Sequence, residues 1–203
     1  MININETLEK WLKGSKDCHC FEDVMNKALC EDRECLILDI TDEVGDVVNN
    51  VIRYWNMIDD NNGTPIEERK PIKLYIDSHG GCLIQSLIMI DTIALSKTPV
   101  WTIGMGAVYS GGFFTFIAGH KRIAYPHASF LYHEGSTGMG GDAGKFRNFA
   151  AFYEKQLDEL KAITLKYTKI TEETYDQHVK DDWWLLAKEA LELGICDEIA
   201  TEL

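Results

Sequence analysis

Apolar residues along the chain form short runs of strand length that alternate with helical repeats. Strand-like runs occupy residues 35–40, 72–77 and 99–104, and shorter ones lie at 122–125 and 129–132. The segment 43–58 places its apolar residues at the spacing of one helix face, and a second helix is expected over 83–95. Strands that alternate with helices are typical of an α/β domain with mostly parallel strand pairing.

A longer helical pattern follows a glycine-rich segment in the second half of the chain. Glycines stand at five positions from 135 to 144, which predicts a flexible or substrate-facing segment. The pattern from about Asp142 to Tyr167 predicts the longest helix. A helix of this length in a small domain indicates an arm that packs on another copy of the chain. Two short helices are expected beyond it, one after Thr171 and one ending at Gly194.

Composition and charge narrow the class of protein. The chain has 203 residues, of which 45% are hydrophobic and 26% charged, as in a soluble globular domain with a core of its own. Its formal net charge of −13 argues against general binding to nucleic acid or to an anionic membrane. We expect a cytoplasmic protein, because the sequence contains neither an apolar run of membrane-spanning length nor the basic and apolar start of a signal peptide.

The six cysteines raise the question of a metal site. In the absence of a secretion signal they are expected to be reduced thiols. The cluster of Cys18, His19, Cys20, Cys30 and Cys35 could in principle ligate zinc, but it lacks the paired Cys-x-x-Cys knuckles of strong zinc motifs. We therefore predict no bound metal.

Ser110 carries the most informative local pattern. It follows the strand-like run 100–103 and is itself followed by Gly111 and Gly112, which predicts a strand, a tight turn and then a helix. One interpretation is that Ser110 only caps this helix, and the local window alone favours it. The other is that Ser110 is a nucleophile, because backbone N–H groups at a helix start stabilise the negative charge that develops in acyl transfer.

Other residues supply what a serine nucleophile would need. A base is available in His133, at the end of the strand-like run 129–132. Asp181 and Asp182 are the candidate acids, although paired aspartates before a helix are also typical caps. Two tryptophans beside them would dehydrate the site and strengthen an Asp–His hydrogen bond. Backbone N–H donors for an oxyanion are expected from Gly111 and from the turn 78–81.

Four motifs in order along the chain resemble the proteolytic subunit of the Clp protease, ClpP. The resemblance runs from about Cys35 to Ile199. The motifs are Ser78-x-Gly80-Gly81, Gly106-x-x-x-Ser110-x-Gly112, Leu131-Tyr132-His133, and Asp182-x-Trp184-x-x-x-x-Glu189-Ala190-x-x-x-Gly194-x-x-Asp197. The resemblance implies a catalytic triad and an oxyanion hole. Their members would be Ser110 as nucleophile, His133 as base, Asp182 rather than Asp181 as acid, and the N–H groups of Gly81 and Gly111.

The same resemblance implies an architecture and partners. The fold would be of the crotonase type, with repeated β-β-α units and a projecting handle helix. Residues 1–34 would form a divergent N-terminal segment and residues 35–203 the peptidase domain, with the handle at about 134–168. Seven-membered rings would stack as a tetradecamer and receive unfolded protein from an AAA+ unfoldase of the ClpX or ClpA type. No cofactor is implied. The peptide would bind as an added β-strand against Gly80 and the handle segment, which comprises Gly135, Ser136, Thr137 and Gly138.

Three departures from the family pattern mark a divergent relative, of the kind that phages encode. His79 stands where the family has proline, Asp181 where it commonly has arginine, and residues 1–34 do not resemble its pore loops. Two other functions remain open. One is a different crotonase-type enzyme, which also uses paired backbone N–H donors but needs no triad. The other is a non-catalytic subunit of a mixed ring.

Overall fold

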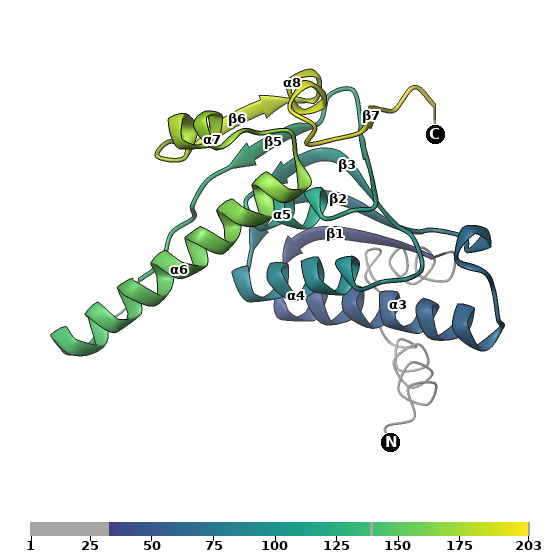
Figure 1. The fold of residues 1–203 in the computed structure, drawn as a ribbon, viewed down its shortest axis with the longest axis horizontal. Coiled ribbons are helices and arrows are strands. Elements are labelled where there is room, and N and C mark those ends of the chain that lie inside the picture. Colours follow the sequence, from purple (N-terminus) through teal and green to yellow (C-terminus); the bar gives the residue numbers. More distant parts are fainter. Residues whose placement is uncertain (1–32, 139, 203) are drawn as a thin grey trace, which may run out of the picture.

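The computed structural model describes residues 33–138 and 140–202, which form one branched β-sheet with helices packed against it (Figure 1). The main path of the sheet runs in the order β1-β2-β3-β4-β7, and every pair along this path is parallel. The strands of this path are β1 (Glu34–Ile40), β2 (Ile72–Gly81), β3 (Val100–Tyr109), β4 (Lys121–Ala124) and β7 (Glu198–Ile199). The predicted α/β class is confirmed.

The sheet branches at β3, and the branch carries the second half of the candidate site. β4 pairs with the first half of β3, whereas β5 (Ser129–Tyr132) pairs in parallel with its last three residues. β6 (Trp183–Leu186) then pairs antiparallel with β5, with Tyr132 opposite Trp183. The end of β3 therefore lies beside the end of β2 on one side and beside β5 on the other.

Three helices build the core against one face of the sheet. α3 (Asp42–Asn61) and α4 (Leu83–Ala94) lie side by side beneath β1 and β2, and α5 (Gly111–Ile117) starts at the end of β3 (Figure 1). All seven residues of α5 are buried, including three phenylalanines that pack on strand residues such as Phe130. Burial of this many aromatic side chains anchors the start of α5, and with it Ser110, in the core. A short 3-10 turn, η2 (Ile66–Glu68), joins α3 to β2.

α6 (Ala143–Tyr167) projects from the body as a long arm (Figure 1). Asp142 caps it, with its carboxylate accepting hydrogen bonds from the N–H groups of Gly144 and Lys145. Only Leu160 and Thr164, both near its C-terminal end, are buried within this chain. Phe146 and Phe152 are 54% and 56% exposed on the arm. This is the projecting helix that the sequence predicts.

The last elements connect the arm back to the sheet. α7 (Glu172–His178) begins after Thr171, whose hydroxyl accepts a hydrogen bond from the N–H of Thr174, as predicted. α8 (Ala187–Glu192) follows β6, and Gly194 adopts a positive φ of 64° just beyond it. Of the helices within residues 33–138 and 140–202, none is both long and apolar enough to span a bilayer.

Two boundaries differ from the sequence prediction, both at the candidate site. β2 continues through Ser78–Gly81, which the sequence predicts as a turn, because Ile40 of β1 and Val108 of β3 continue the ladder on either side. β6 follows Asp181 and Asp182 directly, where the sequence predicts no strand, because residues 183–186 pair with β5. These aspartates are therefore not helix caps.

Candidate functional site

Ser110 occupies the junction of β3 and α5 in a strained backbone conformation. Its φ of 54° and ψ of −122° are unfavourable for a residue with a side chain, and Arg33 is the other described non-glycine residue with positive φ. The N–H of Ser110 donates to the carbonyl of Leu131 over 2.9 Å, which ties the junction to β5. Although Ser110 stands in the N-cap position, its side chain makes no capping hydrogen bond. The hydroxyl is therefore not used to stabilise the helix.

Gly80 and Gly81 lie against Ser110 from the neighbouring strand. Their φ values are 103° and 145°, which favour glycine. A Cβ added to Gly80 would lie 2.6 Å from Ser110 Cβ and 3.1 Å from the N atom of Gly111. A Cβ on Gly111 would in turn lie 3.6 Å from the N atom of Gly81. The two backbone N–H groups that the sequence predicts as oxyanion donors thus belong to adjacent chain segments beside Ser110.

Ser78 supports the Gly80–Gly81 segment at the end of β2 (the glycine loop). Its side chain is fully buried, and its Oγ accepts a hydrogen bond from the N–H of Gly80 over 3.0 Å. A Cβ on Gly112 would lie 3.2 Å from Ser78 Cβ, so no side chain fits between the glycine loop and the first turn of α5. The motif that contains Ser78 and the motif that contains Gly112 therefore pack directly against each other.

His133 and Asp182 leave the antiparallel pair β5–β6 at the same end. Since Tyr132 is opposite Trp183, the next residue of one strand faces the preceding residue of the other. His133 Nδ1 lies 3.9 Å from Asp182 Oδ1, beyond hydrogen-bond distance, and their side chains are 30% and 60% exposed. The Ser110 hydroxyl, likewise, forms no hydrogen bond with His133 in the part of the chain described. Catalytic hydrogen bonds are often long in free enzymes and shorten when the substrate binds.

Contrary to the sequence prediction, the tryptophans next to Asp182 do not dehydrate it. Trp183 stacks on His178, with ring centroids 4.2 Å apart, and so packs back toward α7. Trp184 is 54% exposed and meets Tyr109 edge-on at 5.1 Å. The Asp182 carboxylate consequently stays open to solvent in the single chain.

An aromatic row that local sequence patterns do not predict crosses the sheet next to these residues. The ring of Tyr109 meets those of His79 and Trp184 edge-to-face, with centroid distances of 5.4 and 5.1 Å. The register places Tyr109 opposite Leu131 and Leu131 opposite Trp184. Because paired residues on neighbouring strands present their side chains to the same face, Tyr109, Leu131 and Trp184 share one face of the sheet. Combining this pairing with the strand order would have found the row.

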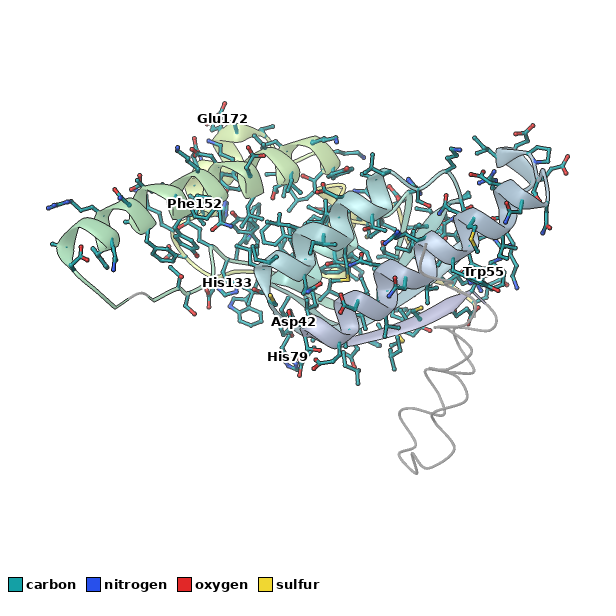
Figure 2. The ribbon with its side chains drawn as sticks, turned by 90° about the horizontal axis from the view of Figure 1, so that it is seen from below. Asp42, Trp55, His79, His133, Phe152 and Glu172 are labelled. Carbon is teal, nitrogen blue, oxygen red and sulfur yellow. The ribbon has the colours of Figure 1, made fainter. Side chains whose placement is uncertain are left out.

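The predicted peptide-binding segment extends from the end of β5 toward α6. Gly135 has a φ of 77°, and Ser136, Thr137 and Gly138 are exposed. Figure 2 shows His133 between the projecting helix, which carries Phe152, and the end of the sheet that carries His79. The segment therefore starts beside the candidate base, while Gly80 stands on the other side of Ser110.

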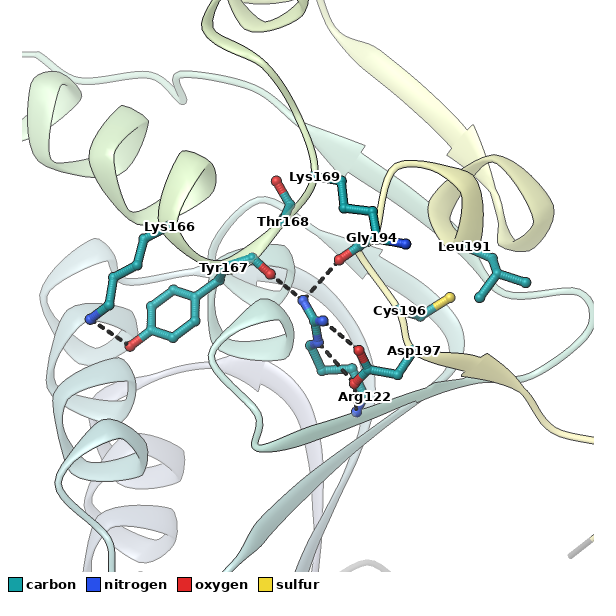
Figure 3. Close-up of a pocket in the computed structure, with 9 residues that line it drawn as sticks. All are labelled: Arg122, Lys166, Tyr167, Thr168, Lys169, Leu191, Gly194, Cys196 and Asp197. Carbon is teal, nitrogen blue, oxygen red and sulfur yellow. Dashed lines mark hydrogen bonds and ion pairs between the residues drawn. The ribbon is translucent and has the colours of Figure 1, made fainter.

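A hollow in the structure lies away from these residues. It has a volume of about 240 Å³ and lies between β4, the C-terminal end of α6 and the residues after α8 (Figure 3). Arg122 crosses it, binding Asp197 at 2.5 Å and the backbone carbonyls of Gly194 and Tyr167. These bonds join three segments of the chain, which is a structural role.

The zinc alternative falls mostly outside the structure. Cys18, His19, Cys20 and Cys30 lie outside the described residues, while Cys35 is buried in β1. No group of three or more potential metal ligands occurs in the described ranges 33–138 and 140–202.

Comparison with known proteins places the chain in a family. The family model described as Clp protease matches residues 21–203, so the chain belongs to the Clp protease family. ATP-dependent Clp protease proteolytic subunit 2 of Treponema pallidum is 35% identical over 132 residues, which cover 64% of this chain and 66% of that protein. The protein of the same name from Nocardia farcinica is 35% identical over 135 residues, which cover 64% of this chain and 65% of the relative.

A third relative aligns over nearly the whole length. ATP-dependent Clp protease proteolytic subunit 2 of Treponema denticola is 28% identical over 200 residues, covering 97% of this chain and 94% of its own. The chain thus spans just under two thirds of the first two relatives and most of the third. Identities of 28 to 35% fit the divergent membership that the sequence indicates.

Proposed function

We propose that this chain is a serine endopeptidase that hydrolyses peptide bonds of unfolded proteins. The observation that carries the proposal is the state of Ser110. Its strained backbone holds the hydroxyl free of any capping bond, directly beside the Gly80–Gly81 loop. A serine held this way at a helix start is suited to attack a carbonyl whose oxygen points at backbone N–H groups.

The proposed mechanism assigns one role to each residue. His133 takes the proton from Ser110 Oγ as this oxygen attacks the peptide carbonyl carbon. The N–H groups of Gly81 and Gly111 stabilise the resulting oxyanion, and Asp182 orients His133 and stabilises its protonated form.

Collapse of the intermediate breaks the C–N bond, and His133 gives its proton to the departing amine. Water, activated by the same imidazole, then releases the acyl group and restores Ser110. No cofactor is needed for this chemistry.

The peptide would lie as an extended strand between two backbone edges. Gly80 on one side and the segment Gly135–Gly138 on the other supply main-chain groups, so affinity would depend little on the side chains of the substrate. Closure of the His133–Asp182 distance from 3.9 Å to hydrogen-bond length would accompany binding or assembly.

We infer an assembly from the same structure. The arm α6 buries two of its residues within the chain and exposes Phe146 and Phe152, so it is suited to pack on another copy. The relatives are named proteolytic subunits of an ATP-dependent protease. We propose heptameric rings, stacked as a tetradecamer in the cytoplasm, that receive chains from an AAA+ unfoldase of the ClpX or ClpA type. Electron micrographs of the purified protein would show seven-fold rings.

Serine-directed labelling tests the catalytic proposal. A fluorophosphonate should modify Ser110, as located by mass spectrometry, and Ser110→Ala should abolish both labelling and cleavage of a peptide ester. Ser96→Ala, at the opposite end of the sheet, serves as the control and should label normally. Labelling that persists in Ser110→Ala would leave the other crotonase-type enzyme as the better interpretation. An unreactive wild-type homo-oligomer would favour the non-catalytic ring subunit.

A further inference from the structure

The two neighbours of His133 are each held by a tyrosine hydroxyl from a different helix. On one side, the hydroxyl of Tyr132 is hydrogen-bonded to that of Tyr175 in α7. On the other side, the hydroxyl of Tyr153 in α6 donates to the backbone carbonyl of Glu134 over 2.7 Å. The candidate base is therefore held between α6 and α7, the two helices that flank its segment.

These two contacts differ in what they hold. The Tyr132–Tyr175 pair is buried in the core, where both rings also meet edge-to-face at 5.3 Å. It fixes the end of β5 as part of the fold. The Tyr153 contact lies one residue beyond His133, where the chain has left the sheet and ladder hydrogen bonds no longer hold it. The position of the His133 backbone on this side depends on a contact made by a side chain.

Tyr153 is held by contacts of its ring as well as of its hydroxyl. Its ring stacks on Phe149, one turn earlier in α6, with centroids 6.4 Å apart and planes inclined by 16°. Its hydroxyl lies 3.8 Å from where a Cβ of Gly135 would be, so the oxygen is close to the start of the peptide-binding segment. The phenol donates its hydrogen to the carbonyl, and burial raises the pKa of Tyr153 further above its ordinary value of 10.

We propose that Tyr153 is a positioning residue for the candidate base, acting through the carbonyl of Glu134. This inference rests on the proposed function, because it assumes that His133 is the base for Ser110. Tyr153 itself contacts no reacting atom. By fixing the peptide unit that follows His133, its hydroxyl limits the directions in which the imidazole can point, at a site where Asp182 is still 3.9 Å away.

The alternative is that Tyr153 only attaches α6 to the body of the protein. In that case removal of the hydroxyl would lower the melting temperature and leave the chemistry of the folded enzyme unchanged. A small fluorophosphonate separates the two roles, because it reacts with Ser110 without occupying the peptide-binding segment. The rate of labelling then reports the base and the nucleophile alone.

The test compares Tyr153→Phe with Tyr167→Phe in the full-length protein. Tyr167 belongs to the same helix, and its hydroxyl contacts Lys166, away from the candidate site. We expect Tyr153→Phe to slow labelling of Ser110 about fivefold, the size expected for one lost hydrogen bond. In peptide cleavage kcat should fall similarly while KM stays unchanged, and Tyr167→Phe should match the wild type in both assays.

Each outcome has one meaning. Rates are measured at a temperature where melting curves show both variants fully folded, so a loss of stability cannot imitate the effect. Labelling of folded Tyr153→Phe at the wild-type rate would overturn the positioning role and leave the proposed peptidase intact. Absence of Ser110 labelling in the wild type would overturn the proposed peptidase instead.

Discussion

The two halves of the candidate site are built in different ways. The half with Ser110 and the glycine loop consists of backbone segments packed at contact distance, with Ser78 fully buried beneath them. The half with His133 and Asp182 projects from strand ends, and those side chains are 30% and 60% exposed. In the first half the ladders of β1, β2 and β3 fix the geometry, whereas the second half depends on side-chain contacts from α6 and α7.

The Ser110 half is therefore rigid within a single chain, whereas the His133–Asp182 half is adjustable. A nucleophile and its oxyanion donors must be held rigidly, since an error of an ångström costs much of the rate. The separation of His133 and Asp182 can close by a small shift of a half-buried and an exposed side chain. The adjustable half is also the one attached to α6, the arm that we propose to pack on another copy. Mutations in the two halves should therefore differ in how they affect the labelling rate and the stability.

The largest effect is expected in the rigid half, from Gly81→Ala. The added Cβ would lie 2.2 Å from the carbonyl oxygen of Ile40, a backbone atom that cannot move aside without distorting β1. The N–H of Gly81 would shift with the strand, so we expect fluorophosphonate labelling of Ser110 to fall at least about 100-fold, as on loss of an oxyanion donor.

Gly63→Ala provides the control for Gly81→Ala. Gly63 also has a positive φ, of 64°, but apart from its chain neighbours no atom of the described residues lies within 4 Å of where its Cβ would be. The substitution should cost about 1 kcal/mol of stability through backbone strain alone and leave labelling unchanged. Normal labelling of Gly81→Ala would mean that the glycine loop does not serve as an oxyanion hole.

A comparable loss of labelling, but without a loss of stability, is expected in the adjustable half, from Asp182→Asn. The amide cannot stabilise protonated His133 as the carboxylate does, so the labelling rate should fall by about 100-fold or more while the melting temperature stays close to that of the wild type. Asp181→Asn makes the same change of charge one residue earlier and should label normally. Equal loss in both variants would show a general charge effect, and loss only in Asp181→Asn would reassign the acid.

The sequence predicts the elements that depend on local pattern. The strand runs, the projecting helix and the cap at Thr171 follow from residue spacing and turn chemistry, and the structure contains them. The extension of β2 through Gly81 depends on neighbouring strands that are distant in the chain, so glycine-rich residues 78–81 look like a turn when read locally. β6 is missed for the same reason, because four residues become a strand by pairing with β5.

The candidate site likewise has parts that a local pattern predicts and parts that it does not. Ser110 and the glycine loop belong to short motifs that can be recognised in the sequence. Tyr153 is 19 residues from the carbonyl it binds, and its role depends on where α6 crosses the segment after His133. Supporting contacts of this kind carry no local signature, since any half-buried tyrosine in a helix produces the same pattern.

A mutation at the far end of the sheet, at Asp59, should lower the stability without changing the candidate site. Asp59 is 2% exposed and binds Arg33 through both carboxylate oxygens, at 2.6 and 2.8 Å. Thr98 donates to the same carboxylate over 2.8 Å. Asp59→Asn leaves the Arg33 guanidinium without its carboxylate partner, so we expect a loss of about 3 kcal/mol in the free energy of unfolding at neutral pH. Labelling of the folded variant should match the wild type.

The pH dependence of that loss identifies its cause. The hydrogen bond from Arg33 holds the pKa of Asp59 below its ordinary value of 3.8, against the opposing effect of burial. A lowered pKa gives stabilisation that is complete above the ordinary pKa and disappears as the pH falls through the folded-state pKa. Urea titrations of wild type and Asp59→Asn should therefore differ most at neutral pH and converge below about pH 4. A constant difference would attribute the loss to packing rather than to the charge of Asp59, and slowed labelling at neutral pH would show that the rigid half of the site extends along the whole sheet.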